Sequence, residues 1–314
     1  MGNHQQFTAI EKADKILCSV CVATYLRTKL LEKLLKSLEN QLLPENVELE
    51  VIIVDNDKYK NALPIVNKFQ NSSRISFHYF NQPIKNLSIT RNVGVNNASG
   101  DYLLFIDDDE VASRQWVYCL LETLKKYDAD GVFGELRPEF NSQTPLWMRR
   151  RDLFYSPAQL TGEKVKFTYT GNCMLKASLL KNMKEPFDIR YTICGEDTHL
   201  FGRLSRQGAH LIYCKEAWTS EYLPTTRTRL SNIFRRGFRG GNAHTRRTIE
   251  FAGRRKIWIR LFMLIKGLAF GTISFVIMII VCLNKVARAK WLIKLGSNIG
   301  RIFAVFGLHY KNHR

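Results

Sequence analysis

The sequence predicts an α/β fold in which helices cover both faces of a doubly wound sheet, followed by a basic helical region rich in apolar residues. Two observations lead to this prediction. Segments typical of strands and of helices alternate from position 15 to position 127, which is the pattern of parallel strands joined by helices. The charge is distributed unevenly: the 25 basic and 25 acidic residues of 1–200 cancel, whereas 201–314 contain 22 lysines and arginines against three glutamates and so carry the whole net charge of +19.

Strands are expected where apolar runs are bounded by polar or turn-forming residues. Residues 15–24 (KILCSVCVAT) form a continuous apolar run, as expected of a strand that is covered on both faces of a sheet. The others are expected at residues 48–57, 74–80, 101–106, 131–140 and 210–218, with a short strand within 169–180.

Helices are expected between these strands. Five leucines recur at helical spacing within residues 30–41, which predicts a helix with one buried face. Ser88 is suited to cap a helix over 88–98, because its hydroxyl can accept a hydrogen bond from the first helical turn. The remaining helices are expected at residues 62–69, 115–127 and 196–208.

The seven cysteines are scattered and odd in number, and the N-terminal segment MGNHQQFTAIEKADK contains no apolar core of the kind a secretory signal needs. We therefore expect reduced thiols and a cytosolic α/β part. Cys18 and Cys21 form a C-x-x-C pair, but both lie in the first apolar run. Zinc needs more ligands than this pair offers, so buried strand residues are the expected interpretation.

Polar residues follow several of the expected strands, and ligands of doubly wound sheets bind at the carboxyl ends of the strands. Thr24, Tyr25 and Arg27 follow the first strand, residues 55–57 the second, and residues 107–110 (DDDE) the fourth. We expect the three groups to face one crevice. Four consecutive carboxylates repel one another unless a cation neutralises them. Mg²⁺ or Mn²⁺ would suit this acidic run, because both take oxygen ligands and often bind phosphate as well. The alternative at this point is a solvated acidic turn without a metal.

Six motifs occur in a characteristic order. They are VATYLR (22–27), VIIVDND (51–57), SITRNVGVNNASGDYLLFIDDDE (88–110), TGNCMLKAS (170–178), GED (195–197) and EYLPTTR (221–227). Together they resemble the family 2 glycosyltransferases with the GT-A fold, and in particular the bacterial exopolysaccharide subgroup typified by succinoglycan glucosyltransferases. The resemblance covers roughly residues 15–245. It implies a mixed GT-A sheet in a catalytic domain at 1–245, and leaves 246–314 as basic, apolar helices that associate with a membrane.

The resemblance also implies which residues bind the nucleotide-sugar donor. Thr24, Tyr25 and Arg27 match the loop that lines the base and ribose. Asp55 matches an acidic residue that bonds the base. Arg91 matches a residue on the diphosphate side of the nucleotide.

A divalent metal is implied by the D-x-D motif. Asp107 and Asp109 match its outer members, the first nearer the ribose and the second on the metal, and Asp108 between them is a further donor-side candidate. Related enzymes often place a histidine ligand after the last strand of the domain. Glu221 stands in that region here, and we take it as a candidate ligand to Mg²⁺ or Mn²⁺.

The catalytic base implied by the resemblance is Asp197 in the GED motif, with Glu196 as the second choice. Asn172, with Gly171 before it, matches the residues beside the donor sugar and the acceptor. In an inverting displacement a carboxylate removes the proton of the attacking hydroxyl, while a separate metal site stabilises the departing diphosphate. The alternative for Glu196 and Asp197 is an acidic helix start that is favoured by the helix dipole.

Arginines in 227–241 raise a further question. Arg227, Arg235 and Arg236 either hold a diphosphate or the phosphate of a lipid carrier, or lie on a solvated basic helix face. The Q-x-x-R-W signature of processive synthases does not occur, which favours the addition of one sugar per encounter.

The basic C-terminal region flanks residues 267–284 (GLAFGTISFVIMIIVCLN), an uninterrupted apolar stretch without a charged side chain. Zinc-finger spacings and RNA-binding signatures do not occur, so an anionic membrane surface is expected as the partner and nucleic acid is not. Basic clusters on both sides disfavour a simple crossing under the positive-inside rule. Attachment in the membrane plane or as a re-entrant hairpin is therefore favoured, with a spanning helix or a buried soluble helix as alternatives.

The sequence thus predicts an inverting, metal-dependent glycosyltransferase at the cytosolic face of the inner (plasma) membrane. It would move a sugar from a nucleotide-diphosphate sugar, with UDP-sugar suggested by the resemblance, to a lipid-linked or polysaccharide acceptor. The alternatives are a catalytically silent module that binds sugar nucleotide or membrane, and a sugar-phosphate nucleotidyltransferase. The latter would need a glycine-rich basic loop after the first strand, where this chain has ATYLRTK.

Overall fold

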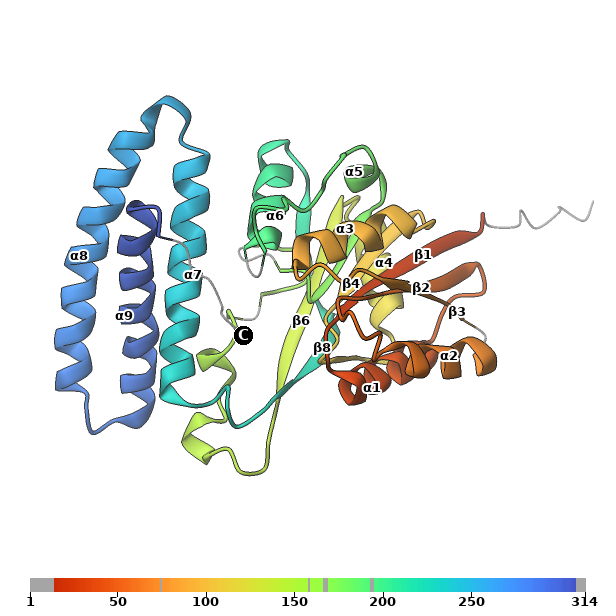
Figure 1. Cartoon of the computed structure of the whole chain (residues 1–314), viewed down its shortest axis with the longest axis horizontal. Helices are drawn as coiled ribbons and strands as arrows, with labels where there is room; N and C mark the ends of the chain where they lie inside the picture. The colour runs from red at the N-terminus through yellow and green to blue at the C-terminus, as the bar shows by residue number, and fades with distance from the viewer. Residues whose placement is uncertain (1–13, 74, 158, 166–168, 193–194, 309–314) are drawn as a thin grey trace, which may run out of the picture.

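The computed structural model describes residues 14–73, 75–157, 159–165, 169–192 and 195–308. These residues form a mixed eight-stranded sheet with helices on both faces, and a layer of three long helices beside it (Figure 1). The N-terminal segment 1–13 and Cys194 lie outside the described residues.

The sheet has the strand order β3-β2-β1-β4-β7-β6-β8-β5. Its first four strands in space are all parallel, as the alternation of strands and helices predicts. In the other half β7 runs antiparallel to β4 and β6, and β5 antiparallel to β8, so the sheet is mixed, as the resemblance implied. The strands are β1 (Ile16–Thr24), β2 (Val47–Asp55), β3 (Ser76–Asn81), β4 (Tyr102–Ile106), β5 (Glu110–Ala112), β6 (Gly131–Phe140), β7 (Asn172–Lys176) and β8 (Leu211–Leu223).

Helices cover both faces of this sheet because each presents one apolar stripe to it. On one face, α1, α2 and α4 pack on the β1–β4 core; α1 buries Leu31, Leu34, Leu35 and Leu38 completely. On the other face, α3, α5 and α6 pack on the second core. The six helices are α1 (Thr28–Glu39), α2 (Leu63–Ser72), α3 (Leu87–Asn97), α4 (Trp116–Lys126), α5 (Ser178–Lys181) and α6 (Glu196–Arg206).

Two local features differ from the sequence prediction. The cap of α3 is Asn86 and not Ser88, because the Asn86 side chain accepts hydrogen bonds from the backbone N–H groups of Ser88 and Ile89. After the acidic run the chain forms β5, in which Glu110 lies opposite Glu221 of β8. Such a short strand carries too little periodicity to be recognised in the sequence.

Cys18 and Cys21 lie in β1 and are buried, in agreement with the expected core position. Burial raises the pKa of both thiols to about 12, so they are neutral at physiological pH. The six cysteines among the described residues are free thiols.

The C-terminal layer consists of α7 (Leu230–Glu250), a short turn η3 (Gly253–Arg255), α8 (Lys256–Ile280) and α9 (Lys285–Val305). In Figure 1 α7 is next to the sheet domain, α9 packs on it, and α8 lies outermost. Lys290 of α9 also forms an ion pair of 2.6 Å with Asp152 of the sheet domain. The boundary expected at residue 245 falls inside α7, which belongs to both parts.

α8 and the η3 turn before it, Gly253–Ile280, are long and apolar enough to cross a membrane, by length and composition alone. Met263, Gly267, Gly271 and Ser274 are buried in α8. The outward face is apolar and open to solvent, with Ile280 73% exposed and Leu283 of the following turn 94% exposed. α8 is therefore not the buried helix of a soluble core, which was one of the alternatives.

Candidate active site

A cavity of about 640 Å³ opens where the carboxyl ends of β1, β2 and β4 meet. The loop after β1 and the acidic run after β4 both line it, so two of the three expected polar groups come together here. Of the third expected group, residues 55–57, only Asn56 lines the cavity. The polar side chains that line the cavity are Thr24, Tyr25, Arg27, Asn56, Lys85, Asn86, Thr90, Arg91, Asp107, Asp108, Asp109, Thr192, Glu221, Arg227 and Arg239.

Asp108 ties the two main loops of this cavity together. Its carboxylate accepts a hydrogen bond of 2.9 Å from Thr24 Oγ1 and one of 2.7 Å from Arg27. Burial raises the pKa of Asp108 to about 6, although Arg27 acts in the opposite direction. The middle residue of the D-x-D motif thus fixes the loop after β1 against the acidic run.

Asp109 and Glu221 lie side by side at the edge of the cavity and share counter-charges. Arg27 and Arg227 approach Asp109 Oδ2 to 2.9 and 2.8 Å. Arg227 also pairs with Glu221, which accepts a hydrogen bond from the Tyr155 hydroxyl. Carboxylate oxygens of this kind suit Mg²⁺ or Mn²⁺, and the two guanidinium groups supply the positive charge that such an ion would bring. Asp107, Asp109 and Glu221 thus offer the oxygen ligands that such an ion takes, although their carboxylates do not converge on one point among the described residues.

Arg91 of α3 connects the acidic run to the start of α6. Its guanidinium is buried and pairs with Glu196 and, at 3.2 Å, with Asp107. Burial raises the pKa of both carboxyl groups, and Arg91 opposes this shift. Glu196 therefore forms a buried ion pair with Arg91 through its Oε1. Its Oε2 has no hydrogen-bond partner among the described residues.

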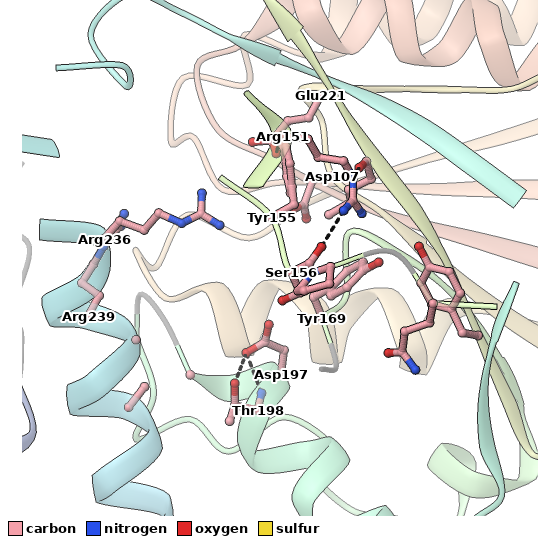
Figure 2. A pocket seen from close by; sticks show the side chains of 17 residues that line it. Asp107, Arg151, Tyr155, Ser156, Tyr169, Asp197, Thr198, Glu221, Arg236 and Arg239 are labelled. Carbon is pink, nitrogen blue, oxygen red and sulfur yellow. Dashed lines mark hydrogen bonds between the residues drawn. The ribbon is translucent and has the colours of Figure 1, made fainter. Parts of the chain in front are cut away.

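Asp197 faces a second cavity of about 470 Å³, shown in Figure 2. Its Oδ1 accepts hydrogen bonds from the Thr198 backbone N–H, at 2.5 Å, and from the Thr198 hydroxyl, at 3.2 Å. Gly195 before it has φ +92°, a left-handed conformation that turns the chain sharply into α6. The two acidic neighbours thus point in different directions, Glu196 into the protein and Asp197 into the cavity.

The second cavity is joined to the first. Asp107, Glu221 and Arg239 line both. Its other polar side chains come from the described residues between β6 and β7, from β8 and from α7: Arg151, Tyr155, Ser156, Gln159, Tyr169, Tyr213 and Arg236. The acidic run after β4 therefore lies between a cavity on the side of β1 and a cavity on the side of α6 and α7.

Besides Glu196, the expected residues Asp55 and Asn172 line neither cavity. Asp55 is 1% exposed and accepts hydrogen bonds from Tyr79 Oη (3.0 Å) and the Ala62 N–H (3.1 Å), which fastens the start of α2. Asn172 is fully buried and bonds Trp116 Nε1 (2.7 Å) and the Ala217 carbonyl (2.9 Å). Both hold the frame of the site in this structure. In the described structure neither side chain lines the cavity of the donor loops or that of Asp197, and their contacts with the donor stay a prediction.

Sequence reasoning did not find Tyr155, Arg151 or Lys85. Arg151 begins a short 3₁₀ helix, and Tyr155 and Lys85 lie in loops. None of these segments carries a periodic pattern, and only the final fold brings them to the cavities. Arg239 belongs to the basic segment FRRGFRGG (234–241). The composition of this segment indicated an anion-binding region, but the sequence did not show that Arg239 itself lines a cavity.

A separate cluster of side chains that could act as metal ligands lies where α6 meets α7. Ligand atoms of Asp188, His199 and Glu250 lie within 4.8 Å of one another. Arg190 donates to both carboxylates, at 2.5 and 2.6 Å, and so already provides their counter-charge. This group is an ion-paired cluster that joins α6 to α7.

Comparison with known proteins gives consistent results. Residues 19–184 match the model of glycosyl transferase family 2. The succinoglycan biosynthesis protein ExoM of Rhizobium meliloti is 35% identical over 241 residues, which is 76% of this chain and 77% of that protein. The poly(ribitol-phosphate) β-N-acetylglucosaminyltransferase TarS of Staphylococcus aureus is 24% identical over 164 residues, and the match spans 28% of its length.

Solved structures agree on the fold. TarS residues 1–349 in complex with UDP align with a TM-score of 0.54 over 94% of this chain and 93% of that chain, at 18% identity. A mannosyltransferase from Pyrobaculum calidifontis in complex with GDP-Man and Mn²⁺ aligns with a TM-score of 0.64 over 94% and 88%, at 15% identity. The chain has the GT-A fold, belongs to glycosyl transferase family 2 and is a glycosyltransferase.

Proposed function

We propose that this glycosyltransferase is inverting and divalent-metal-dependent, and that it moves a sugar from a UDP-sugar to a lipid-linked or polysaccharide acceptor at the cytosolic membrane face. One observation carries the proposal. Two separate carboxylate sites, Asp107 with Asp109 and Glu221 on one side and Asp197 on the other, face two cavities that share a wall. Displacement of a diphosphate by a hydroxyl group requires these two kinds of site.

The donor would lie in the cavity at the carboxyl ends of β1, β2 and β4. Tyr25 and Asn56 line the part beyond the loop after β1, where a base and ribose would lie. When bound, a divalent ion on Asp107, Asp109 and Glu221 would neutralise the diphosphate. Arg27 and Arg227, which neutralise these carboxylates in the described structure, are placed to turn to phosphate oxygens instead.

Asp197 would act as the base. The acceptor hydroxyl would enter from the second cavity and attack the anomeric carbon from the side opposite the diphosphate, while its proton passes to the carboxylate of Asp197. The hydrogen bonds from Thr198 hold one oxygen of this carboxylate, which leaves Oδ2 directed at the cavity. Attack from the opposite side inverts the configuration at the anomeric carbon.

The choice of UDP-sugar and acceptor follows the relatives. TarS has been solved with UDP and with UDP-GlcNAc. ExoM is named for succinoglycan biosynthesis, and a Campylobacter jejuni glucosyltransferase that is 33% identical over 93 residues is named for a glycan linked to PP-undecaprenol. The exposed apolar face of α8 supports a membrane location for this chain.

A donor screen tests the proposal. Purified full-length chain is incubated with Mg²⁺ or Mn²⁺ and a panel of UDP-, GDP- and dTDP-sugars, and release of nucleoside diphosphate is measured. We expect release from a UDP-sugar that stops with EDTA and in Asp109→Ala. Metal-independent release, or release equal in Asp109→Ala, would contradict the proposed metal site.

A further inference from the structure

The proposed base Asp197 is held by its neighbour Thr198, and Thr198 is held in turn by α7. The Thr198 backbone N–H and hydroxyl both donate to Asp197 Oδ1, as the dashed lines in Figure 2 show. The Thr198 carbonyl oxygen accepts a hydrogen bond of 3.3 Å from the guanidinium of Arg247 in α7. An arginine of another helix thus reaches the base through one intervening residue.

The side chain of Arg247 packs closely on α6 at this contact. A Cβ added to Gly202 of α6 would lie 3.1 Å from Arg247 Cδ, so the arginine stem crosses α6 where that helix has no side chain. Burial lowers the pKa of the Arg247 guanidinium, and the negative charge of Asp197 opposes this shift. The guanidinium therefore lies close enough to Asp197 for the two charges to interact, although it does not line the cavity of Asp197.

Two further residues of α7 contact the chain that precedes the base. A Cβ added to Gly195 would lie 3.4 Å from Ala243 Cβ, so α7 passes directly beside the turn that leads into α6. Glu250 accepts hydrogen bonds from Arg190, at 2.6 Å, and from the Tyr191 hydroxyl, at 2.7 Å. These bonds fasten the segment before the base to the last turn of α7.

These contacts come from one face of α7. Ala243, Arg247 and Glu250 are four and three residues apart, which places them on the same side of a helix. Earlier positions of this face line the cavity of Asp197: Arg236, Arg239 and Gly240. The first part of the face is therefore a wall of the cavity, and the second part holds the residues before and after the base.

We infer that Arg247 and Glu250 are positioning residues for sugar transfer, which hold the carboxylate of Asp197 so that its Oδ2 faces the attacking hydroxyl group. Arg247 acts through Thr198, on the C-terminal side of the base. Glu250 acts through Tyr191 and its neighbour, on the N-terminal side. The inference rests on the proposed function, because it takes Asp197 as the base. It gives α7 a part in the reaction as well as in the wall of the cavity.

Steady-state kinetics of full-length variants test the inference. The rate of UDP release from the UDP-sugar that the donor screen selects is expressed per UDP-binding site, titrated by calorimetry, so that an unfolded fraction does not count. Arg247→Met keeps an apolar stem over Gly202 and removes the guanidinium. We expect its kcat to fall by about 10–100-fold, because a displaced base is less effective, while KM and UDP affinity stay within about twofold. Arg247→Lys, which can still donate to the Thr198 carbonyl, should recover most of the rate. Glu250→Ala should also lower kcat, by about tenfold, without a change in KM.

Arg206→Met is the matched control. Arg206 also joins α6 to α7, because it donates to the Phe251 carbonyl at 2.9 Å and lies 4.2 Å from the centroid of that ring. It is the last residue of α6, at the opposite end of the helix from Asp197. Its substitution loosens the contact of the two helices without touching the base, so we expect kcat to stay within about twofold of the wild type.

Three results would overturn the inference. They are a wild-type kcat in Arg247→Met, a raised KM with unchanged kcat in that variant, and an equal loss of kcat in Arg247→Met and Arg206→Met. The last result would show that the general packing of α6 on α7 is responsible, and not the contact with Thr198. Wild-type UDP release by Asp197→Asn would instead count against the proposed function, because the base itself would then be wrong.

Discussion

Adjacent acidic residues in this chain have different environments, although the sequence shows them as a single run. Asp108 bonds Thr24 and Arg27, and Asp109 pairs with Arg27 and Arg227. Glu110 is buried in β5 and accepts a hydrogen bond of 2.6 Å from Thr219. Burial raises the pKa of Glu110 well above its usual value. A cluster of acidic residues is stable here because each carboxyl group has at least one hydrogen-bond or ion-pair partner, and Arg27 serves two of them.

The sequence could identify the residue types of the site but not all of their orientations. GED contains two carboxylates, and composition cannot tell which one faces a cavity. The structure separates them through Arg91, which lies on a different helix 105 residues away from Glu196 in sequence. Asp55 and Asn172 could be recognised in the sequence as motif residues. Their hydrogen bonds to Tyr79 and Trp116, which are distant in sequence, could not be predicted from it.

His199 gives a pH prediction at this scale. Its ring is buried between Tyr191 and Phe251, at centroid distances of 5.1 and 5.5 Å, and burial lowers its pKa. Glu250 and Asp188 oppose this shift, and Arg203 and Arg190 add to it. The unfolded chain therefore binds a proton at His199 more readily than the folded chain, so the folded chain loses stability as pH falls below about 6.5.

His199→Phe keeps the aromatic stack and removes the titrating group. Urea unfolding of the wild type and the variant at pH 8.0 and 5.5 gives the difference in free energy of unfolding at each pH. We expect this difference to move in favour of the variant by on the order of 1 kcal/mol at the lower pH. A difference that does not change with pH would show that His199 titrates equally in both states.

At the scale of elements, periodicity predicted the regular part of the fold well. The β1–β4 strands and α1 to α4 occur close to the expected residues, because apolar runs of strand length alternate with segments that have helical spacing or a cap residue. β5 and the 3₁₀ helices η1 (Leu146–Met148) and η2 (Arg151–Leu153) were not predicted, since segments this short have no period. Local pattern does not encode the antiparallel direction of β7 either.

The contact between α7 and α9 relies on glycines in both helices. A Cβ added to Gly241 would lie 1.9 Å from the Ser297 carbonyl oxygen, and one added to Gly300 would lie 2.1 Å from that of Phe238. The backbones of the two helices are thus in direct contact, in the small-residue spacing known from membrane helices. This contact holds α9 to the helix that carries Arg236.

Gly241→Ala and Gly240→Ala form a matched pair on α7. We expect Gly241→Ala to lower the free energy of unfolding by about 2 kcal/mol or more, because the neighbour is rigid backbone. Gly240 has nothing within 4 Å of an added Cβ, so Gly240→Ala should stabilise by about 0.5–1 kcal/mol through helix propensity. Chemical unfolding measures both, and equal effects of the two substitutions would contradict the close α7–α9 packing.

The whole molecule combines a GT-A domain with a helical layer whose outer helix is apolar. α9 packs between α7 and α8, and α7 also lines the cavities, so the helical layer is part of the site. The sequence located this region by its charge and its long uncharged run at 267–284. It did not show that α7 joins the two parts, because the helix is polar along most of its length.

Membrane binding is predicted for the outer face of this layer. Full-length protein should float with vesicles that contain phosphatidylglycerol, and less at high salt, because basic residues flank the apolar face. Ile280→Asp combined with Leu283→Asp should reduce the bound fraction by about tenfold or more, since two buried apolar side chains are lost from the bilayer. Tyr59→Asp, an exposed position on the sheet domain, is the control. Flotation of the double variant at the wild-type level would place the attachment elsewhere.

The central claim is that donor binding and proton removal are carried out by two different carboxylate sites, and Asp197→Asn tests it most directly. Metal-dependent UDP binding and the rate of sugar transfer are measured for this variant with the donor found by the screen. We predict UDP binding at the wild-type affinity and a transfer rate lower by about 10²–10⁴-fold, because no group removes the hydroxyl proton. Transfer by Asp197→Asn at the wild-type rate would contradict the account.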